Sequence, residues 1–99
     1  MLIDFFLVQF ESRMKKIKNK ELLTSISLAF KELRSNEGLT QQNVKDDTGI
    51  HIGRIETTTN DPSSSTIFEL CKYFKIPLSE FYRRLEEINP NLKIKKNKR

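Results

Sequence analysis

The chain has 99 residues, a formal net charge of +5 and a hydrophobic fraction of 36%, which allows one domain with a modest core, with or without an arm. Its single cysteine, Cys71, excludes an internal disulfide and fits a reducing compartment. No apolar run approaches the roughly 18 residues that cross a bilayer. We therefore expect a cytoplasmic protein with no membrane partner.

The positive charge is concentrated at the two ends of the chain. Residues 1–24 carry five basic and three acidic side chains, residues 25–87 carry eight and ten, and residues 88–99 carry five and none. Phosphate contacts supply most of the salt-dependent affinity for DNA. The central region alone would therefore hold a nucleic acid weakly.

The N-terminal segment begins M-L-I-D-F-F-L-V-Q-F, without the basic leader or the small-residue cleavage site of a signal peptide. Its apolar residues recur with heptad spacing, at Ile3, Leu7, Phe10, Met14 and Ile17. This spacing predicts an amphipathic helix that packs on its own domain or dimerises. A third alternative is an upstream extension without a role, since M-K-K-I-K-N-K from Met14 is typical of a bacterial protein start.

The next predicted helix is capped by Thr24 or Ser25 and runs to Glu37. Its buried face has helical spacing and consists of Ile26, Phe30 and Leu33, with Ala29 beside them. Gly38 then suits the left-handed position that ends a helix.

Two very short helices set at an angle are predicted between residues 39 and 56. Thr40 can cap the first helix, in which only Val44 is clearly apolar. Asp47 or Thr48 can cap the second helix, and Gly49 can adopt the backbone angles of the turn between them. The buried residues of the second helix would be Ile52 and Ile55.

Two more helices follow the polar loop T-T-T-N-D-P-S-S-S. In the first, Ser65 is the expected cap, and the expected buried residues are Ile67, Leu70, Cys71 and Phe74. Cys71 lies on this apolar stripe without a cationic cluster, so we interpret it as a core side chain rather than a reactive thiol. In the second, Ser79 is the expected cap, and the expected buried residues are Phe81, Leu85 and Ile88.

No stretch alternates with period two over a length that would predict a strand, so the fold class is all-α. We expect an N-terminal amphipathic helix or extension over residues 1–23, a five-helix domain over residues 24–88 and a basic tail over residues 89–99.

Three stretches together resemble the Cro and lambda-repressor type of helix-turn-helix domain, the xenobiotic-response-element family. They are S-L-A-F-K-E-L-R-S-N-E-G-L-T-Q-Q-N-V, I-G-R-I-E and N-D-P-S-S-S-T-I-F-E-L-C-K-Y-F-K-I-P-L-S-E-F. The resemblance covers about residues 25–85. It implies a compact five-helix lambda-repressor-like bundle, here with an additional N-terminal helix, whose third helix enters the DNA major groove.

The chain departs from the family at the turn. Gly49 and Ile52 are separated only by Ile50 and His51, fewer residues than such domains commonly have there. Either the turn is abbreviated and Thr48 caps the third helix, or the third helix starts late.

The candidate DNA-contacting residues are Thr40, Gln41, Thr48, Gly49, Ile50, His51, Gly53, Arg54, Thr57, Thr58 and Asn60. The resemblance implies that Gln41 touches phosphate. Arg54 can pair with guanine, His51 can meet a purine edge, and Gly53 would allow a close backbone approach. Ile50 is either a thymine-methyl contact or a core residue. Residues 57–60 could donate hydroxyl and backbone N–H groups to phosphate.

The resemblance also implies an interior ion pair between Arg34 and Glu56. A pair is physically reasonable, because two charges on core-facing helices are tolerated only when joined. The alternative is that both are exposed surface charges.

These expectations lead to a dimeric repressor that binds a double-stranded DNA operator as a homodimer and acts by occlusion. The alternative is a helix-turn-helix-fold protein-interaction module with little or no DNA binding. An enzyme is not expected, because one histidine, one cysteine and no glycine-rich phosphate loop assemble no catalytic group. We expect no cofactor, no small-molecule ligand and no metal at His51, which lacks a ligand cluster.

Overall fold

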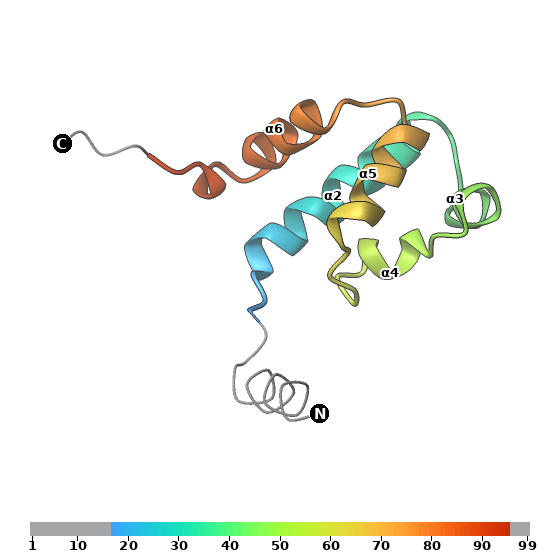
Figure 1. Cartoon of the computed structure of the whole chain (residues 1–99), viewed down its shortest axis with the longest axis horizontal. Coiled ribbons are helices and arrows are strands. Elements are labelled where there is room, and N and C mark those ends of the chain that lie inside the picture. The colour runs from blue at the N-terminus through green and yellow to red at the C-terminus, as the bar shows by residue number, and fades with distance from the viewer. Residues whose placement is uncertain (1–16, 96–99) are drawn as a thin grey trace, which may run out of the picture.

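The computed structural model describes residues 17–95 and contains, over that range, five α-helices, one short 3₁₀ helix and no strand (Figure 1). The elements are α2 (Lys20–Asn36), α3 (Gln41–Thr48), α4 (Ile52–Glu56), α5 (Ser64–Tyr73), α6 (Leu78–Ile88) and η1 (Pro90–Leu92). The predicted all-α class is confirmed. The helix expected near the N-terminus falls mainly on residues 1–16, which lie outside the described range.

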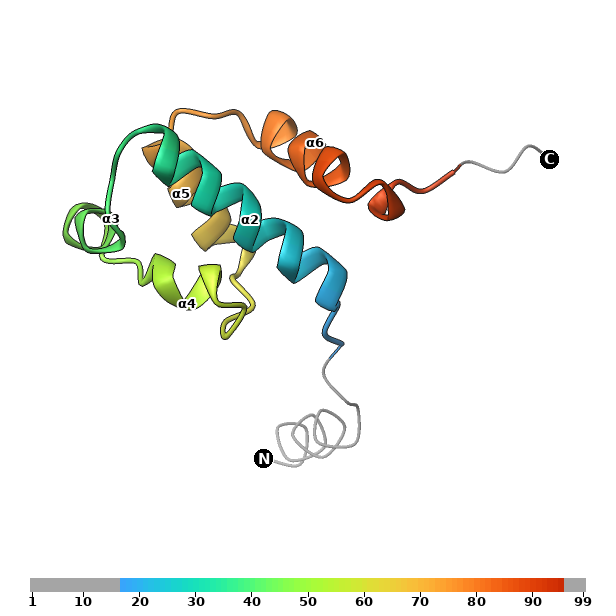
Figure 2. The same ribbon diagram turned by 180° about the vertical axis from the view of Figure 1, so that it is seen from behind.

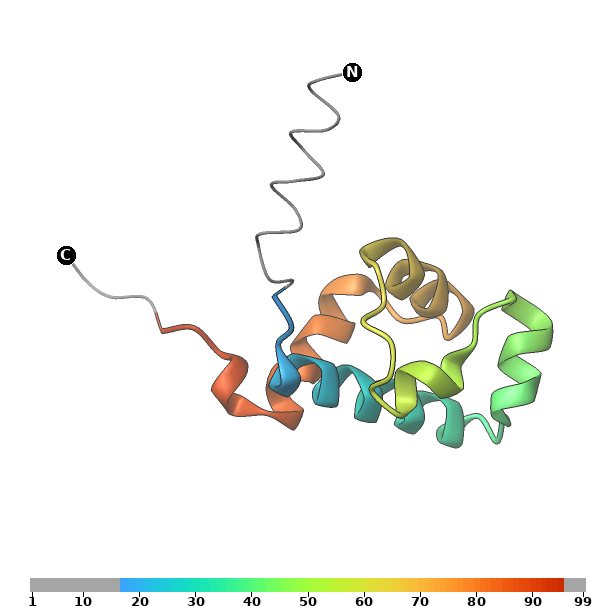
Figure 3. The same ribbon diagram turned by 90° about the horizontal axis from the view of Figure 1, so that it is seen from below.

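The central helix is α2. Helices α4 and α6 pack on either side of it, and α5 covers a third side (Figures 1 and 2). Two buried serines of α2 donate hydrogen bonds to the helices on either side. Ser25 donates to the Leu85 carbonyl of α6 (3.2 Å), and Ser27 donates to the Glu56 carbonyl of α4 (3.0 Å). Helix α3 and η1 lie at opposite ends of the molecule, as all three views show (Figures 1, 2 and 3).

The hydrophobic core joins α2, α5 and α6 through three phenylalanines. The Phe30 ring stacks on Phe81 with 4.5 Å between centroids, and lies 6.3 Å from Phe74. The predicted core positions that are buried are Ile26, Ala29, Phe30, Leu33, Val44, Ile52, Ile55, Ile67, Leu70, Cys71, Phe74, Phe81 and Leu85. Ile88 is only partly buried at the edge of this core.

The start of α2 differs from the prediction. The Asn19 side chain accepts a hydrogen bond from the Leu22 backbone N–H (3.1 Å), so the helix begins at Lys20. The prediction of a cap at Thr24 or Ser25 is wrong, because Asn19 satisfies the free N–H groups one turn earlier.

The starts of the last two helices also differ from the prediction, each by two residues. Ser63, rather than Ser65, caps α5 and accepts a hydrogen bond from the Thr66 N–H (3.2 Å). Helix α6 begins at Leu78, after Pro77, whose fixed φ of −60° leads into the first turn, so the predicted cap at Ser79 is wrong.

A hydrogen bond holds α3 onto α5. The Tyr73 hydroxyl donates to the Asp47 carboxylate over 2.6 Å, and this bond, with desolvation and the nearby negative charges, raises the pKa of Tyr73 to about 12. The tyrosine therefore keeps its proton throughout the neutral range and donates the hydrogen bond that joins the end of α3 to α5.

Candidate nucleic-acid interface

Helix α3 begins with a reciprocal cap, as expected at Thr40. The Thr40 hydroxyl accepts from the Asn43 N–H (3.0 Å), and the Asn43 side chain accepts from the Thr40 N–H (2.9 Å). The N–H groups of Gln41 and Gln42, in the first turn, have no carbonyl partner inside the helix. They are the backbone donors that this helix end offers to an anion.

The spacing between Gly49 and Ile52 left two alternatives, an abbreviated turn capped by Thr48 or a late start of the next helix, and the turn between α3 and α4 decides between them. Gly49 ends α3 with a φ of +76°, as expected. Thr48 is still helical; its hydroxyl donates to the Val44 carbonyl (2.7 Å) and accepts the Ile50 N–H (3.0 Å). The predicted cap of the second helix at Asp47 or Thr48 is therefore wrong, and α4 starts late, at Ile52.

Helix α4 has five residues and two faces. Ile52 is fully buried and Ile55 is 3% exposed, whereas His51, at the N-cap position, and Arg54 are exposed. This division follows the predicted pattern. Ile50 is half-buried against the core, which agrees with its interpretation as a core residue.

The Arg34 and Glu56 side chains form the ion pair implied by the resemblance. Arg34 donates to both Glu56 carboxylate oxygens over 2.7 and 2.9 Å, and to the Leu39 carbonyl over 2.8 Å. Gln41 donates a further bond to Glu56 over 3.0 Å. This network joins the end of α2, the α2–α3 turn, the start of α3 and the end of α4.

The electrostatics of the network favour the charged pair. Burial raises the pKa of Glu56, but the hydrogen bonds from Arg34 and Gln41 and the charges of Arg34 and Lys31 outweigh it, so the pKa lies below its ordinary value. The hydrogen bond to Glu56 raises the pKa of Arg34 against the effect of desolvation. Both groups are therefore ionised at neutral pH.

The lack of a side chain at Gly53 allows another group to come close to the α4 backbone, as expected, but in the structure that group is the Gln41 side chain. A Cβ atom on Gly53 would stand 2.8 Å from the Gln41 side-chain oxygen. The side chain of Gln41 thus fits against α4 and is bonded to Glu56, so it is not free to reach outward. Its backbone N–H remains as the donor for a phosphate.

A shallow hollow of about 270 Å³ lies between the outer sides of α3 and α4. Its lining combines the predicted Gln41, His51, Gly53 and Arg54 with Gln42, Lys45 and the buried Ile52. The sequence reasoning missed Lys45 and Gln42. Lys45 lies one turn after Gln41, so helical spacing from the predicted phosphate contact would have placed it on this side.

The expected donors of the loop after α4 are hydrogen-bonded within the protein. The N–H groups of residues 57–60 all donate to carbonyls of α4, over 2.9 to 3.2 Å. The hydroxyls of Thr57 and Thr58 also donate within the loop and α4, to the carbonyls of Gly53 and Thr57. These N–H groups and hydroxyls would have to give up their internal hydrogen bonds to hold a phosphate, so their role as phosphate donors stays a prediction. The exposed Asn60 side chain is still available to a partner.

Across residues 17–95, no three His, Cys, Asp or Glu side chains gather in a way that could hold a metal ion. In the same range, no helix has the length and apolar character to cross a membrane. Cys71 is 1% exposed, and burial raises the pKa of its thiol to about 11, so the thiolate is scarce at neutral pH.

Comparison of the chain with protein-family models, with curated proteins and with solved structures finds no match.

Proposed function

We propose that this protein binds double-stranded DNA in a sequence-specific manner and regulates transcription as a dimeric repressor in the cytoplasm. The observation that carries the proposal is the geometry of α3 and α4. Two short helices are locked together by Arg34, Glu56 and Gln41, and the side of α4 away from the core exposes Arg54 and His51.

The mechanism assigns different tasks to the two helices. The free N–H groups of Gln41 and Gln42 and the charge of Lys45 would hold a phosphate at the edge of the groove. The exposed side of α4 would enter the major groove, where Arg54 would donate two hydrogen bonds to a guanine and His51 would meet a neighbouring base.

The length of α4 limits what one copy can read. Five residues extend over only about 7.5 Å, so few side chains reach the bases. Two copies on half-sites about 34 Å apart would double the contacts and specify an operator with two-fold symmetry. Binding there would block polymerase, which is the basis of the proposed repression.

Selection of bound duplexes from a pool with a randomised centre tests the proposal. The full-length protein should enrich a two-fold symmetric sequence, and Arg54→Ala should relax the preference at one position in each half-site, with a loss of roughly 1–3 kcal/mol of discrimination there. Arg83→Ala is the matched control, since Arg83 lies on α6 between Glu80 and Glu87 and outside the hollow. An unchanged preference in Arg54→Ala would remove Arg54 from the base-reading set.

A second candidate function is a protein-interaction module that has this fold without affinity for DNA. The internal hydrogen bonding of residues 57–60 favours it, because the loop beside α4 offers a phosphate few donors. The slight excess of acidic residues over residues 25–87 points the same way. If no duplex is retained even at low ionic strength, where phosphate attraction is greatest, this second function replaces the first.

A further inference from the structure

An apolar groove of about 490 Å³ lies at the end of the molecule where the chain enters α2 and leaves η1. Its apolar lining consists of Leu22, Tyr82, Leu85, Leu92 and Ile94, which we call the end groove. Leu22 is 37% exposed, Tyr82 41% and Ile94 91%, so these side chains are uncovered within residues 17–95.

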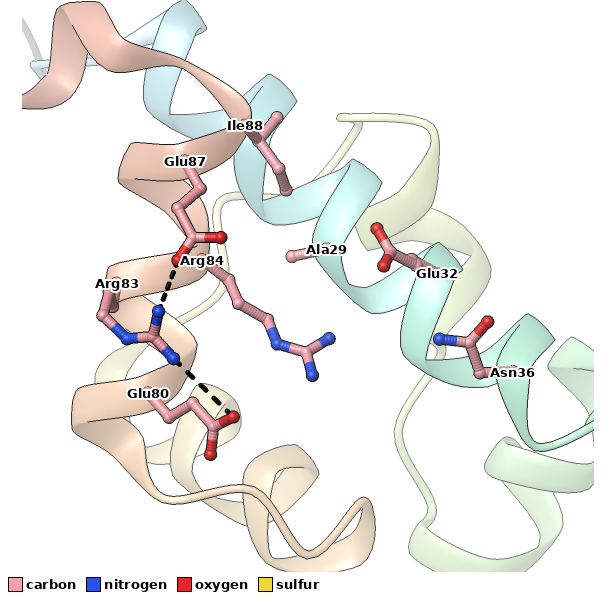
Figure 4. A pocket seen from close by; sticks show the side chains of 8 residues that line it. All are labelled: Ala29, Glu32, Asn36, Glu80, Arg83, Arg84, Glu87 and Ile88. Carbon is pink, nitrogen blue, oxygen red and sulfur yellow. Dashed lines mark hydrogen bonds and ion pairs between the residues drawn. The ribbon is translucent and has the colours of Figure 1, made fainter.

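The end groove differs in character from a neighbouring hollow between α2 and α6, drawn in Figure 4. That hollow is lined mainly by charged side chains, and Arg83 is paired there with Glu80 and Glu87. Charged side chains of this kind are stable in contact with water, so that hollow needs no cover. The end groove, by contrast, favours an apolar occupant.

The N-terminal segment of the same chain supplies such an occupant. Residues 1–16, which lie outside the described range, include the heptad seam of Ile3, Leu7, Phe10 and Met14, besides Phe5, Phe6 and Val8. The next seam position, Ile17, is 88% exposed. This much apolar surface on one short segment calls for a cover.

The connection between the segment and the groove is short and well placed. Only residues 17–19 separate the segment from α2, and Asn19 itself lines the end groove. Three residues suit the loop of an αα-hairpin, which takes about two to five. Glu86 lines the groove, and the segment carries Arg13, Lys15 and Lys16 near its end, so their opposite charges would favour docking.

We infer that residues 1–16 fold back and dock their apolar seam into the end groove of the same chain. Because the end groove adjoins η1 and the candidate DNA-binding side includes α3, the two lie at opposite ends of the molecule (Figures 1 and 3). The end groove shares no lining residue with the hollow between α3 and α4, so this inference is independent of the proposed DNA binding.

The absence of tryptophan from the chain gives a direct test. In full-length Phe10→Trp, the single indole reports whether the seam is buried. Its emission should be shifted to shorter wavelength relative to Gln9→Trp, whose position lies off the seam. The shift should be the same at all protein concentrations, because the contact is within one chain.

Substitutions on α2 then identify the surface that covers the indole. Leu22→Glu in the Phe10→Trp chain should return the emission to longer wavelength, whereas Leu28→Glu should leave it unchanged. Leu28 is the matched control, since it is 48% exposed on the same helix and does not line the groove. Circular dichroism checks that each variant is folded, and Tyr82→Gln is the second groove variant if Leu22→Glu unfolds.

Four outcomes would overturn the inference. They are emission from Phe10→Trp typical of an indole in water, a shift that survives both groove substitutions, a shift that disappears on dilution, and a shift that needs lipid vesicles. The third outcome would assign the segment to a second copy of the chain, and the fourth to a membrane surface.

Discussion

Thr58 occupies a backbone conformation that its side chain disfavours. Its φ is +59°, in the left-handed region that a β-branched residue rarely enters. The conformation is imposed by the end of α4, where the Thr58 N–H donates to the Ile55 carbonyl and the Thr59 N–H to the Arg54 carbonyl. This is the Schellman arrangement, in which glycine is usual at the left-handed residue.

Thr58→Gly should therefore stabilise the protein. Relief of the left-handed strain is worth roughly 1–2 kcal/mol, and the greater freedom of glycine in the unfolded chain offsets about half of it, so we expect a net gain of about 0.5–1 kcal/mol. Urea unfolding measures the gain. Thr59→Gly is the control and should destabilise, because Thr59 has an ordinary φ. Equal losses in both variants would show that Thr58 is not strained.

Left-handed residues also mark a limit of prediction from sequence. Gly38 and Gly49 were predicted at helix ends because only glycine enters this region without strain, and both have positive φ. Thr58 and Lys75 also have positive φ, at +59° and +56°, but their side chains give no local signal of it. The hydrogen bonds of residues 57–60 to α4 were also missed, because no glycine marks the left-handed residue at Thr58.

At the scale of the helix, periodicity predicted the buried faces better than capping predicted the helix starts. Ile67, Leu70 and Phe74 are buried as expected although α5 begins two residues before the predicted start. The spacing of a buried face does not depend on which of several adjacent serines caps the helix. The late start of α4 was one of two alternatives, and the hydroxyl of Thr48 decides it by bonding inside α3 and the turn.

Arg34→Leu tests how the ion pair joins the helices. The change leaves the Glu56 carboxylate, 3% exposed, with Gln41 as its remaining side-chain partner. We expect a loss of roughly 3 kcal/mol, the low end for a broken buried pair, because the Arg34 side chain is itself 15% exposed. The exposed ion pairs of Arg83 offer a control: Arg83→Leu should cost less than about 1 kcal/mol.

The loss in Arg34→Leu should depend on pH. The pKa of Glu56 in the folded protein lies below its ordinary value of 4.5, so the stability it contributes is present above that value and is lost as pH falls through the folded pKa. The difference between wild type and Arg34→Leu should thus be full at neutral pH and shrink in acid. Urea unfolding at several pH values measures it, and a difference that does not change with pH would exclude Glu56 as its origin.

At the scale of the whole molecule, the largest excess of positive charge lies in the C-terminal tail, away from the candidate base-reading side chains. Residues 88–99 carry five basic and no acidic side chains, while Arg54 and Lys45 supply the nearby positive charge at the hollow. The tail leaves the fold at the end opposite α3 (Figure 1). Residues 93–99, the part of the tail after η1, would span at most about 25 Å if extended, similar to the length of the 17-residue α2 at about 1.5 Å per residue. The tail can therefore reach phosphates that flank the base-reading contact.

Neutralising the tail tests whether its basic side chains bind phosphate while the side chains at the hollow read the bases. Substitution of Lys93, Lys95, Lys96, Lys98 and Arg99 by glutamine preserves the chain length and Ile94, so the end groove stays intact. With a non-specific duplex, the slope of log K against log salt should fall by about one for each phosphate that the tail no longer neutralises. Lys72→Gln, on α5, combined with Lys75→Gln, just after α5, is the control outside the hollow and should leave the slope unchanged. An unaltered slope in the tail variant would exclude the tail from phosphate binding, and Lys45 at the hollow between α3 and α4 would become the next residue to neutralise.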